Sequence, residues 1–445
     1  MTGARAAPAA IPAEGERTLS LRGATVLGIG SMVGAGIFAL LGEAGAVAGA
    51  AVWISFLIGG AVAGLLGYVC AKLGMRYPSS GGLITYLTKG YGLGRLVGIT
   101  AWLGYISAVV VVTAMVAVSF GGYAVSLFLD QGAWDGWDNV FISALLIAMC
   151  ALNVVGARAV AAAQAAIVIG VLAVFGVFIT VTVPRIDLGL LSFDGYPSVS
   201  KIIASVALTF FAFLGFNVLT FTAGDLKNPR RNLPLAMALS LGITTVLYVL
   251  IAIGVFGTLT VPEVIGYGET AIAEAARPAL GDAGFTAMAI AALLATAGCT
   301  NATLYASGNL TEQLAEVRLF PAFFGSGSRL GRNAGLLITT GLVLLIANFF
   351  ELGAIASVGS AVSLAVFLLV AGAGWVRRHD TASNPVIIIA AMAVIGVVLG
   401  FFLADTIRNA PETFIAMIGV GILAIVLDAL CRRPAPPPTT AVSHP

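Results

Sequence analysis

Apolar stretches of bilayer-spanning length recur along the whole chain and limit its fold more than any other feature. A helix of about 20 apolar residues is long enough to cross a membrane. Hydrophobic residues make up 59% of the chain and charged residues only 9%. A soluble domain has no interior large enough for such a composition, and the alternating pattern of a membrane β-barrel is absent. The sequence therefore predicts an all-α polytopic membrane protein.

Twelve apolar segments qualify as membrane spans. We expect them at 23–48, 50–74, 95–128, 138–156, 159–183, 201–225, 234–259, 283–313, 334–350, 353–376, 385–405 and 411–431. The polar ends, 1–22 and 432–445, are predicted to be disordered.

The distribution of Lys and Arg supports this count. If the N-terminus is cytoplasmic, most of the 22 Lys and Arg residues fall in inside segments, as the positive-inside rule requires. The outside segments then hold only Arg185, Lys201, Arg277 and Arg408. We expect a multi-pass protein of the cell membrane with both termini in the cytoplasm. The net charge of +2 and the lack of a basic block give no sign of nucleic-acid binding.

A glycine cluster, GSMVGAGIF at 30–38, lies in the middle of the first span. Glycine inside a helix costs about 0.5–1 kcal/mol relative to alanine. A cluster at mid-depth therefore suggests a broken helix whose backbone groups face a ligand. Close packing of helices through small residues is the alternative interpretation.

The sixth span repeats this feature at FLGFN, 213–217. The first span starts inside and the sixth starts outside, so two sets of five spans have opposite orientation. This predicts an inverted repeat of 23–183 and 201–376, with a broken helix at the same place in each half. The last two spans, 385–431, lie outside the repeat.

A broken helix in a membrane can hold both ends of a zwitterion. Its N-terminal half-helix end suits a carboxylate, and its free carbonyls suit an ammonium group. No Lys, Arg or His lies in the middle of any span, so the backbone has to supply these charges. The side chains near the two breaks are Ser31, Met32, Phe38, Phe210, Phe211, Phe213, Leu214, Phe216 and Asn217. The phenylalanines either line a substrate or fill the core, whereas Asn217 needs a hydrogen-bond partner at that depth.

Three acids are candidates for gating or coupling. Glu43 follows the first break, Asp225 ends the sixth span, and Glu312 lies near the inner end of the eighth. A structural ion pair of Asp225 with Arg230 or Arg231 is the alternative for that residue. Because all three lie near span ends, a solvated role is the simpler interpretation for each.

Nothing in the sequence indicates an enzyme. Both histidines, His379 and His444, lie outside the predicted spans, and no cluster of His, Asp, Glu or Cys shares one depth. The four cysteines form no CxxC pair and are expected to pack as small apolar residues. We expect no metal and no cofactor.

Four motifs in order resemble the amino acid/polyamine/organocation permeases. These are GSMVGAGIF, RYPSSGGLITYLTKGYG after the second span, FFAFLGFN in the sixth, and DLKNPRRNLP after it. The resemblance covers essentially the whole chain. It implies the five-plus-five fold of sodium-coupled neurotransmitter-type transporters with two extra C-terminal helices, and broken first and sixth helices.

The resemblance also implies a substrate site at the two breaks. Carbonyls around Phe210 to Leu214, with Phe211 among them, would meet the substrate amine, and Tyr105 in the third span would help to line the pocket. The α-carboxylate and α-amine would contact the backbone of Ser31, Met32, Val33, Gly34, Ala35, Gly36 and Ile37.

The chain departs from this family at positions linked to proton coupling. The fifth span reads IVIGVL at 167–172, where some proton-coupled relatives carry a lysine. Gly224 stands where many relatives have an acid, Asn309 where relatives have an arginine, and Asn217 where some antiporters have an acid. These departures weaken a polyamine substrate, because no central carboxylate is available to balance a second positive charge.

The sequence thus predicts a secondary active transporter of neutral amino acids that works by alternating access. Coupling by proton symport and coupling by substrate exchange both remain open. A polyamine or organic amine transporter of the same fold is the alternative. An ion channel would need a continuous polar lining, and the sequence offers only isolated polarity at two breaks.

Overall fold

Helices make up nearly all of the regular structure in the described part of the chain. The computed structural model describes residues 19–79, 82–129, 136–155, 160–223, 226–325 and 332–431. Most of the N-terminal segment predicted to be disordered, and the whole C-terminal one, lie outside these ranges.

The α-helices and the shorter helical segments follow each other without a strand in the described residues. The α-helices are α1 (Leu21–Ala35), α2 (Ile37–Ala48), α3 (Val52–Arg76), α4 (Gly82–Tyr91), α5 (Arg95–Tyr105), α6 (Val112–Phe128), α7 (Trp137–Val155), α8 (Val160–Thr182), α9 (Val199–Ala212), α10 (Val218–Phe221), α11 (Pro229–Phe256), α12 (Val261–Tyr267), α13 (Ala271–Glu274), α14 (Arg277–Glu316), α15 (Arg332–Phe349), α16 (Leu352–Val376), α17 (Pro385–Asn409) and α18 (Pro411–Cys431). The shorter segments used below are the 3-10 helices η1 (Gly49–Ala51), η5 (Leu214–Asn217) and η6 (Gly268–Thr270), and the π-helix η2 (Ile106–Val111).

Many of these helices are long and apolar enough to cross a membrane. Within the described residues there are nine such spans, or ten if the bent pair formed by α9 and the η5–α10 segment counts as one. The second half of the first predicted span, α2, and the second predicted span, α3, are joined through η1 in that count, although Gly49 with φ +55° lies between them. The shorter helix Asn333–Phe349 is apolar as well. The chain is therefore a polytopic helical membrane protein, while the count of twelve spans stays a prediction.

Local signals in the sequence set several helix ends. The Ser20 hydroxyl accepts a hydrogen bond from the Gly23 amide and caps α1. Asn384 caps α17 by accepting from the Val386 amide, with Pro385 as the first helical residue. Such caps satisfy amides that have no partner inside the helix.

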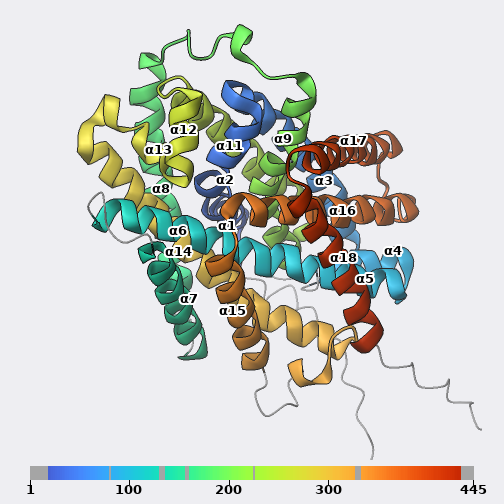
Figure 1. Ribbon diagram of the computed structural model, residues 1–445. Coiled ribbons are helices and arrows are strands. Elements are labelled where there is room, and N and C mark those ends of the chain that lie inside the picture. Colours follow the sequence, from blue (N-terminus) through green and yellow to red (C-terminus); the bar gives the residue numbers. More distant parts are fainter. Residues whose placement is uncertain are drawn as a thin grey trace, which may run out of the picture.

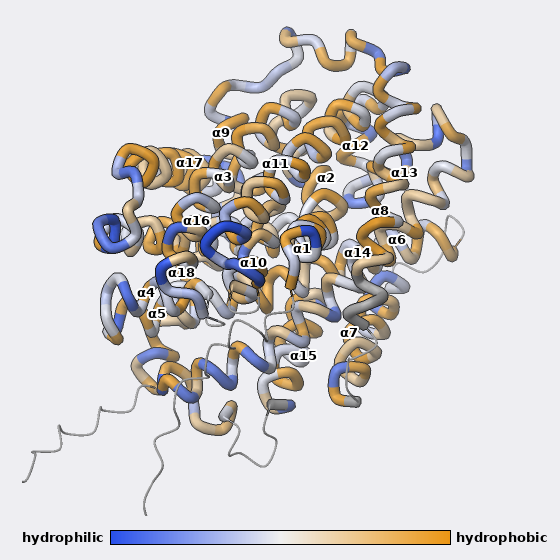
Figure 2. Tube along the Cα trace, turned by 180° about the vertical axis from the view of Figure 1, so that it is seen from behind, coloured by the Kyte–Doolittle hydropathy of each residue, from blue (hydrophilic) through white to orange (hydrophobic). Residues whose placement is uncertain are grey.

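Helices α1 and α2 lie near the middle of the bundle (Figure 1). Helix α1 contacts α11, α14, α8 and η5, and α2 contacts α9, α12 and η6. Hydrophilic residues gather at helix ends and in connections, and the helices between them are largely hydrophobic (Figure 2). This pattern is typical of a helical bundle that is surrounded by lipid.

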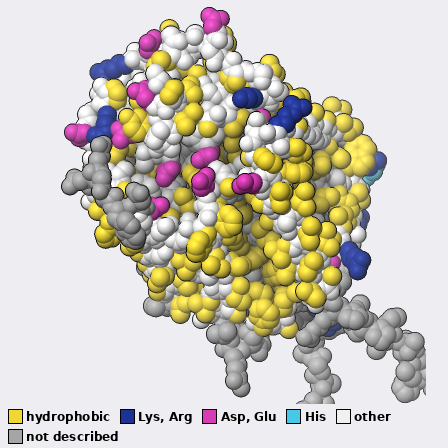
Figure 3. All heavy atoms as spheres, in the orientation of Figure 1, with side chains coloured by type: hydrophobic (Ala, Val, Ile, Leu, Met, Phe, Trp, Pro, Cys, Tyr) yellow, Lys and Arg dark blue, Asp and Glu magenta, His cyan; other side chains and the backbone are white. Residues whose placement is uncertain are grey.

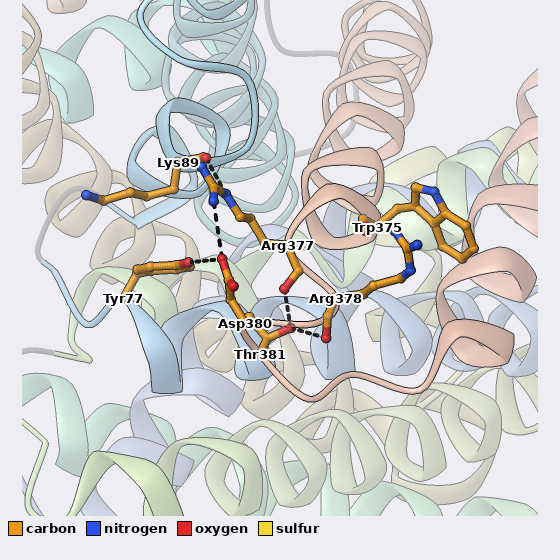
Figure 4. Close-up of polar contacts among 7 residues, drawn as sticks. All are labelled: Tyr77, Lys89, Trp375, Arg377, Arg378, Asp380 and Thr381. Carbon is orange, nitrogen blue, oxygen red and sulfur yellow. Dashed lines mark hydrogen bonds and ion pairs between the residues drawn. The ribbon is translucent and has the colours of Figure 1, made fainter.

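The segment after the second span forms the short helix α4, which packs against α16. Arg377 donates from Nε to the Lys89 carbonyl at 2.7 Å and pairs with Asp380 at 3.2 Å (Figure 4). The Tyr77 hydroxyl also donates to Asp380 at 3.2 Å. This cluster joins the end of α3, the end of α4 and the connection between α16 and α17.

The start of α1 is tied to the segment that follows α10. Leu19 and Leu226 form an isolated parallel β-bridge, and the Lys227 amide donates to the Leu19 carbonyl at 2.9 Å. Two segments that are far apart in sequence are therefore joined on the predicted inner side.

Two expected elements differ in detail from the structure. The expected helix 95–128 contains the π-helix η2, a local widening that often marks functional regions. Before the eighth expected span, the chain forms η6, α13 and the first turn of α14. Gly281, with φ +64°, then kinks α14, so the span expected at 283–313 starts within a longer helix.

Candidate functional site

The first span is broken at Gly36, as the glycine cluster predicts. Helix α1 ends at Ala35 and α2 begins at Ile37, with Gly36 between them at φ −108° and ψ −80°. The break is narrower than expected, because residues 31–35 still belong to α1. It leaves the last carbonyls of α1 and the first amides of α2 without partners inside their helices.

The sixth span is broken over a longer segment. Helix α9 ends at Ala212, the 3-10 segment η5 follows Phe213, and α10 completes the span. The two parts of the span are bent by 43°. The 3-10 turn has fewer well-formed helical bonds than an α-helix, so this break also exposes backbone groups.

The two breaks touch each other through glycine. A Cβ added at Gly215 would lie 2.5 Å from the Ser31 carbonyl oxygen and would also overlap the Met32 amide. Contact this close requires a residue without a side chain. The structure therefore brings the two predicted break regions together.

Gly36 faces polar groups that belong to the second predicted repeat, 201–376. A Cβ at this position would lie 2.5 Å from the Tyr248 hydroxyl and would also contact the Ala212 carbonyl oxygen. The Tyr248 hydroxyl in turn lies 3.5 Å from that carbonyl. A backbone carbonyl at a helix end and a hydroxyl thus converge on the first break.

Asn217 is the polar side chain of the second break. It is 6% exposed, and its amide oxygen has no hydrogen-bond partner among the described residues. An unpaired buried amide costs about 1–3 kcal/mol, so it is retained where it has a ligand or another role.

The phenylalanines around the second break are packed into the core. Phe210 and Phe216 contact Phe367 of α16, with ring centroids 5.8 and 5.4 Å apart. Phe211 lies against Gly359 of the same helix. These contacts connect the break to α16, and Leu214 is buried beside them.

The remaining predicted residues of the first break are mostly buried. Met32, Val33 and Ile37 are at most 3% exposed. Gly34 allows α14 to approach, since a Cβ there would lie 2.7 Å from the Ala295 carbonyl oxygen. The side chain of Ala35 lies outside the described residues.

Tyr105 belongs to a different cluster. Its hydroxyl shares a hydrogen bond of 2.7 Å with Thr339 of α15, and its ring packs edge-on against Phe320 at 5.4 Å. This residue therefore joins α5 to α15, and its predicted contact with substrate is untested.

The three candidate acids have different surroundings. Glu43 is half-buried on α2. Glu312 is half-buried on α14 and has no ion pair with another described residue. Asp225 lies outside the described residues.

The contact between α1 and α8 is apolar where some relatives carry a lysine. A cavity of about 10 Å³ lies there, and Val168 packs directly against Gly30. Its lining residues are Gly30, Val33, Ile167, Val168, Val171, Leu172 and Ala295. None of these lining residues carries an ionisable side chain that could bind a proton.

Two positions of this site were missed by sequence reasoning. Tyr248 and Gly215 each contact the first break, yet neither was among the predicted site residues. Gly215 stood within the FLGFN motif and could have been found there. The signal for Tyr248 was a hydroxyl in the middle of an apolar span, the same kind of signal that pointed to Asn217.

Two interrupted helices that meet inside a membrane bundle are typical of membrane transporters. Comparison with known proteins gives the family: the family model described as amino acid permease matches residues 19–425, and the chain belongs to this family.

Related proteins are membrane transporters and not enzymes. The inner membrane transport protein YbaT of Escherichia coli is 32% identical over 421 residues, covering 94% of this chain and 97% of YbaT. The methylthioribose transporter of Bacillus subtilis is 28% identical, with 81% of each chain covered. The serine/threonine exchanger SteT of Bacillus subtilis is 27% identical, covering 69% of this chain and 70% of SteT.

Proposed function

We propose that this permease is a secondary active transporter of neutral amino acids that works by alternating access. The observation that carries the proposal is the meeting of the two breaks at Gly36 and Gly215. No charged residue lies within 29–42 or 202–223, so the backbone has to bind the charged ends of a substrate. One net-neutral zwitterion suits such a site.

The roles of the groups follow from their chemistry. The first amides of α2, after Gly36, suit the substrate carboxylate because the positive end of a helix dipole favours an anion. The Ala212 carbonyl and the Tyr248 hydroxyl suit the ammonium group. The amide oxygen of Asn217 supplies an acceptor for a polar side chain of the substrate.

The proposal includes the predicted architecture. The repeats 23–183 and 201–376 would form the five-plus-five unit, followed by the two helices of 385–431, with both termini in the cytoplasm and the protein in the cell membrane. The bundle that contains both broken spans would rock against the remaining helices. Coupling would be proton symport or exchange, with Glu43, Asp225 and Glu312 as candidate groups.

Transport by the purified protein tests this proposal. The protein is reconstituted into liposomes, and uptake of each of the 20 radiolabelled amino acids and of putrescine is compared with uptake by empty liposomes. We expect saturable uptake of a neutral amino acid, accelerated by the same unlabelled amino acid inside the vesicles. Uptake of putrescine alone would favour an organic amine transporter. Unsaturable flux would indicate a channel, and no flux of any compound would overturn the proposal.

A relative's name supplies the first substrates to try. Since SteT is a serine/threonine exchanger, serine and threonine head the panel. Binding can be checked without flux, because a ligand of the folded protein raises its melting temperature.

A further inference from the structure

Three carboxylates from separate elements lie near one another around the middle of α2. They are Glu43 on α2, Glu269 on η6 and Glu351, the residue before α16. The charges of Glu269 and Glu351 both act on Glu43. Acidic side chains gather in the middle of the face shown in Figure 3, surrounded by a largely hydrophobic surface.

The backbones that carry the first two carboxylates are in contact. A Cβ added at Gly42 would lie 2.6 Å from the Gly268 carbonyl oxygen, so Glu43 and Glu269 each follow one of two touching glycines. A Cβ at Gly353 would meet the Glu43 carboxylate, which places that side chain on the first turn of α16. A Cβ added at Gly122 of α6 would meet the Glu269 carboxylate, so the side chain of Glu269 lies against α6.

No cation among the described residues is paired with these carboxylates. Arg277, the nearest basic residue in sequence to Glu269, is bound by Glu274 and Asp282. Other charged groups lie on the elements packed on α2. Glu263 of α12 is bound by Thr260, and Glu274 of α13 is bound by Arg277. The basic groups are Lys201 at the start of α9, Arg22 at the start of α1, and Lys72 and Arg76 at the far end of α3.

A buried hydroxyl beside Glu269 has no partner. Tyr123 of α6 follows Gly122, is 0% exposed, and its hydroxyl has no hydrogen-bond partner among the described residues. The negative charge of Glu269 is close enough to act on this hydroxyl. The ring packs edge-on against Phe38 of α2, with centroids 5.7 Å apart. The hydroxyl is thus an unused hydrogen-bond donor next to the carboxylate group.

We propose that Glu43 and Glu269 form a proton-binding site that links closure of α2 against η6 to protons on the outer side. In the closed arrangement the two carboxylates hold one proton, which removes the repulsion between them, and the buried, unpaired Tyr123 hydroxyl lies close by. When the proton leaves, the two charges repel each other and α2 moves away from η6. The inference rests on the proposed transport function and supplies its coupling ion, the proton.

Burial also favours binding of a proton at this site. It raises the pKa of Glu269 above the ordinary value for glutamate, and the charge of Asp138 adds to this shift. The closed protein therefore binds a proton that the open protein releases. Two carboxylates in one partly buried site titrate as a pair, so one proton is the expected stoichiometry.

Uptake at varied external pH tests the site. With internal pH held constant, we expect uptake by the wild-type protein to rise at least about fivefold as external pH falls from about 8 to about 6. The variants Glu43→Gln and Glu269→Gln should keep substrate-driven exchange and lose most of this rise. Glu412→Gln, the same change at an exposed carboxylate of α18, should respond like the wild type.

A measurement without substrate separates this inference from the transport proposal. Because the folded protein holds the extra proton, its melting temperature should fall as pH rises above the ordinary pKa of glutamate. This fall should be smaller in Glu269→Gln than in the wild type and in Glu412→Gln. Both variants, Glu43→Gln and Glu269→Gln, are compared with the wild type for the pH dependence of uptake and of the melting temperature. If neither differs from the wild type in either measurement, the proposed proton site is wrong, although the protein is still a transporter. If no compound is transported, the melting curves alone decide the site.

Discussion

At the first break a single residue, Gly36, leaves the helical conformation, whereas at the second a whole 3-10 turn separates α9 from α10. The surroundings differ as well. Gly36 faces the Ala212 carbonyl and the Tyr248 hydroxyl, and the second break is enclosed by aromatic rings that reach α16. The first break therefore depends on the absence of a side chain, and the second on which side chains are present.

This contrast indicates different parts in binding. The first break provides backbone that is the same for every amino acid, and the second carries Asn217, which can discriminate between substrates. Side-chain additions should then do most harm at the first break, and side-chain exchanges should alter preference at the second.

The largest effect is expected for Gly36→Leu. The new side chain would overlap the Tyr248 hydroxyl and the Ala212 carbonyl, so substrate binding and transport should fall below detection while membrane insertion persists. Uptake per folded molecule, quantified by size-exclusion chromatography, is the measurement. Gly64→Leu is the matched control, because no atom lies within 4 Å of a Cβ there. Normal transport by Gly36→Leu would show that the site is elsewhere.

A smaller effect, a loss of substrate affinity, is expected for Gly215→Ala. One methyl group would push the second break away from the Ser31 carbonyl, and overpacking of this kind costs about 1–3 kcal/mol, or about fivefold to about 150-fold in affinity. The concentration for half-maximal uptake measures this loss. Gly242→Ala, in open space on α11, should have no effect. Equal affinities for the two variants would mean that the breaks do not act together.

Asn217→Leu should separate stability from binding. Removing an unpaired buried amide should leave the melting temperature without substrate unchanged or raise it by the equivalent of about 1 kcal/mol. Affinity for hydroxyl-bearing amino acids should fall about tenfold relative to alanine, the loss of about one hydrogen bond. In contrast, Asn153→Leu should destabilise the protein, because the Asn153 amide donates to Asn301 at 2.8 Å. A lower melting temperature for Asn217→Leu with unchanged selectivity would assign Asn217 to packing.

The smallest effect is expected for Tyr248→Phe. The hydroxyl is 3.5 Å from the Ala212 carbonyl, too long for a strong bond, so its loss should weaken substrate binding about threefold. Tyr86→Phe removes another buried hydroxyl, one that packs near Gly74, and should not change binding. Identical uptake curves for the two variants would remove Tyr248 from the site.

The membrane helices and the position of both breaks could be predicted because they depend on local sequence. Apolar length predicts a span, and three glycines within GSMVGAGIF indicate where a helix is interrupted.

The contacts across the site could not be predicted, because they depend on which segments meet in space. No local pattern shows that Gly215 lies on Ser31, or that Tyr248 reaches the first break. The same holds for Glu43 and Glu269, which lie more than two hundred positions apart in the chain and are brought near each other where Gly42 meets Gly268.

The bridge between Leu19 and Leu226 bears on how the inner side opens. The Lys227 amide and the Leu19 carbonyl fasten the entrance of α1 to the exit of α10. Under the topology proposed above, these two segments would move together as one body when the inner side opens. The inner side should then open in one step. A proline at position 227 lacks the amide that donates to Leu19, so it should let the two segments move separately.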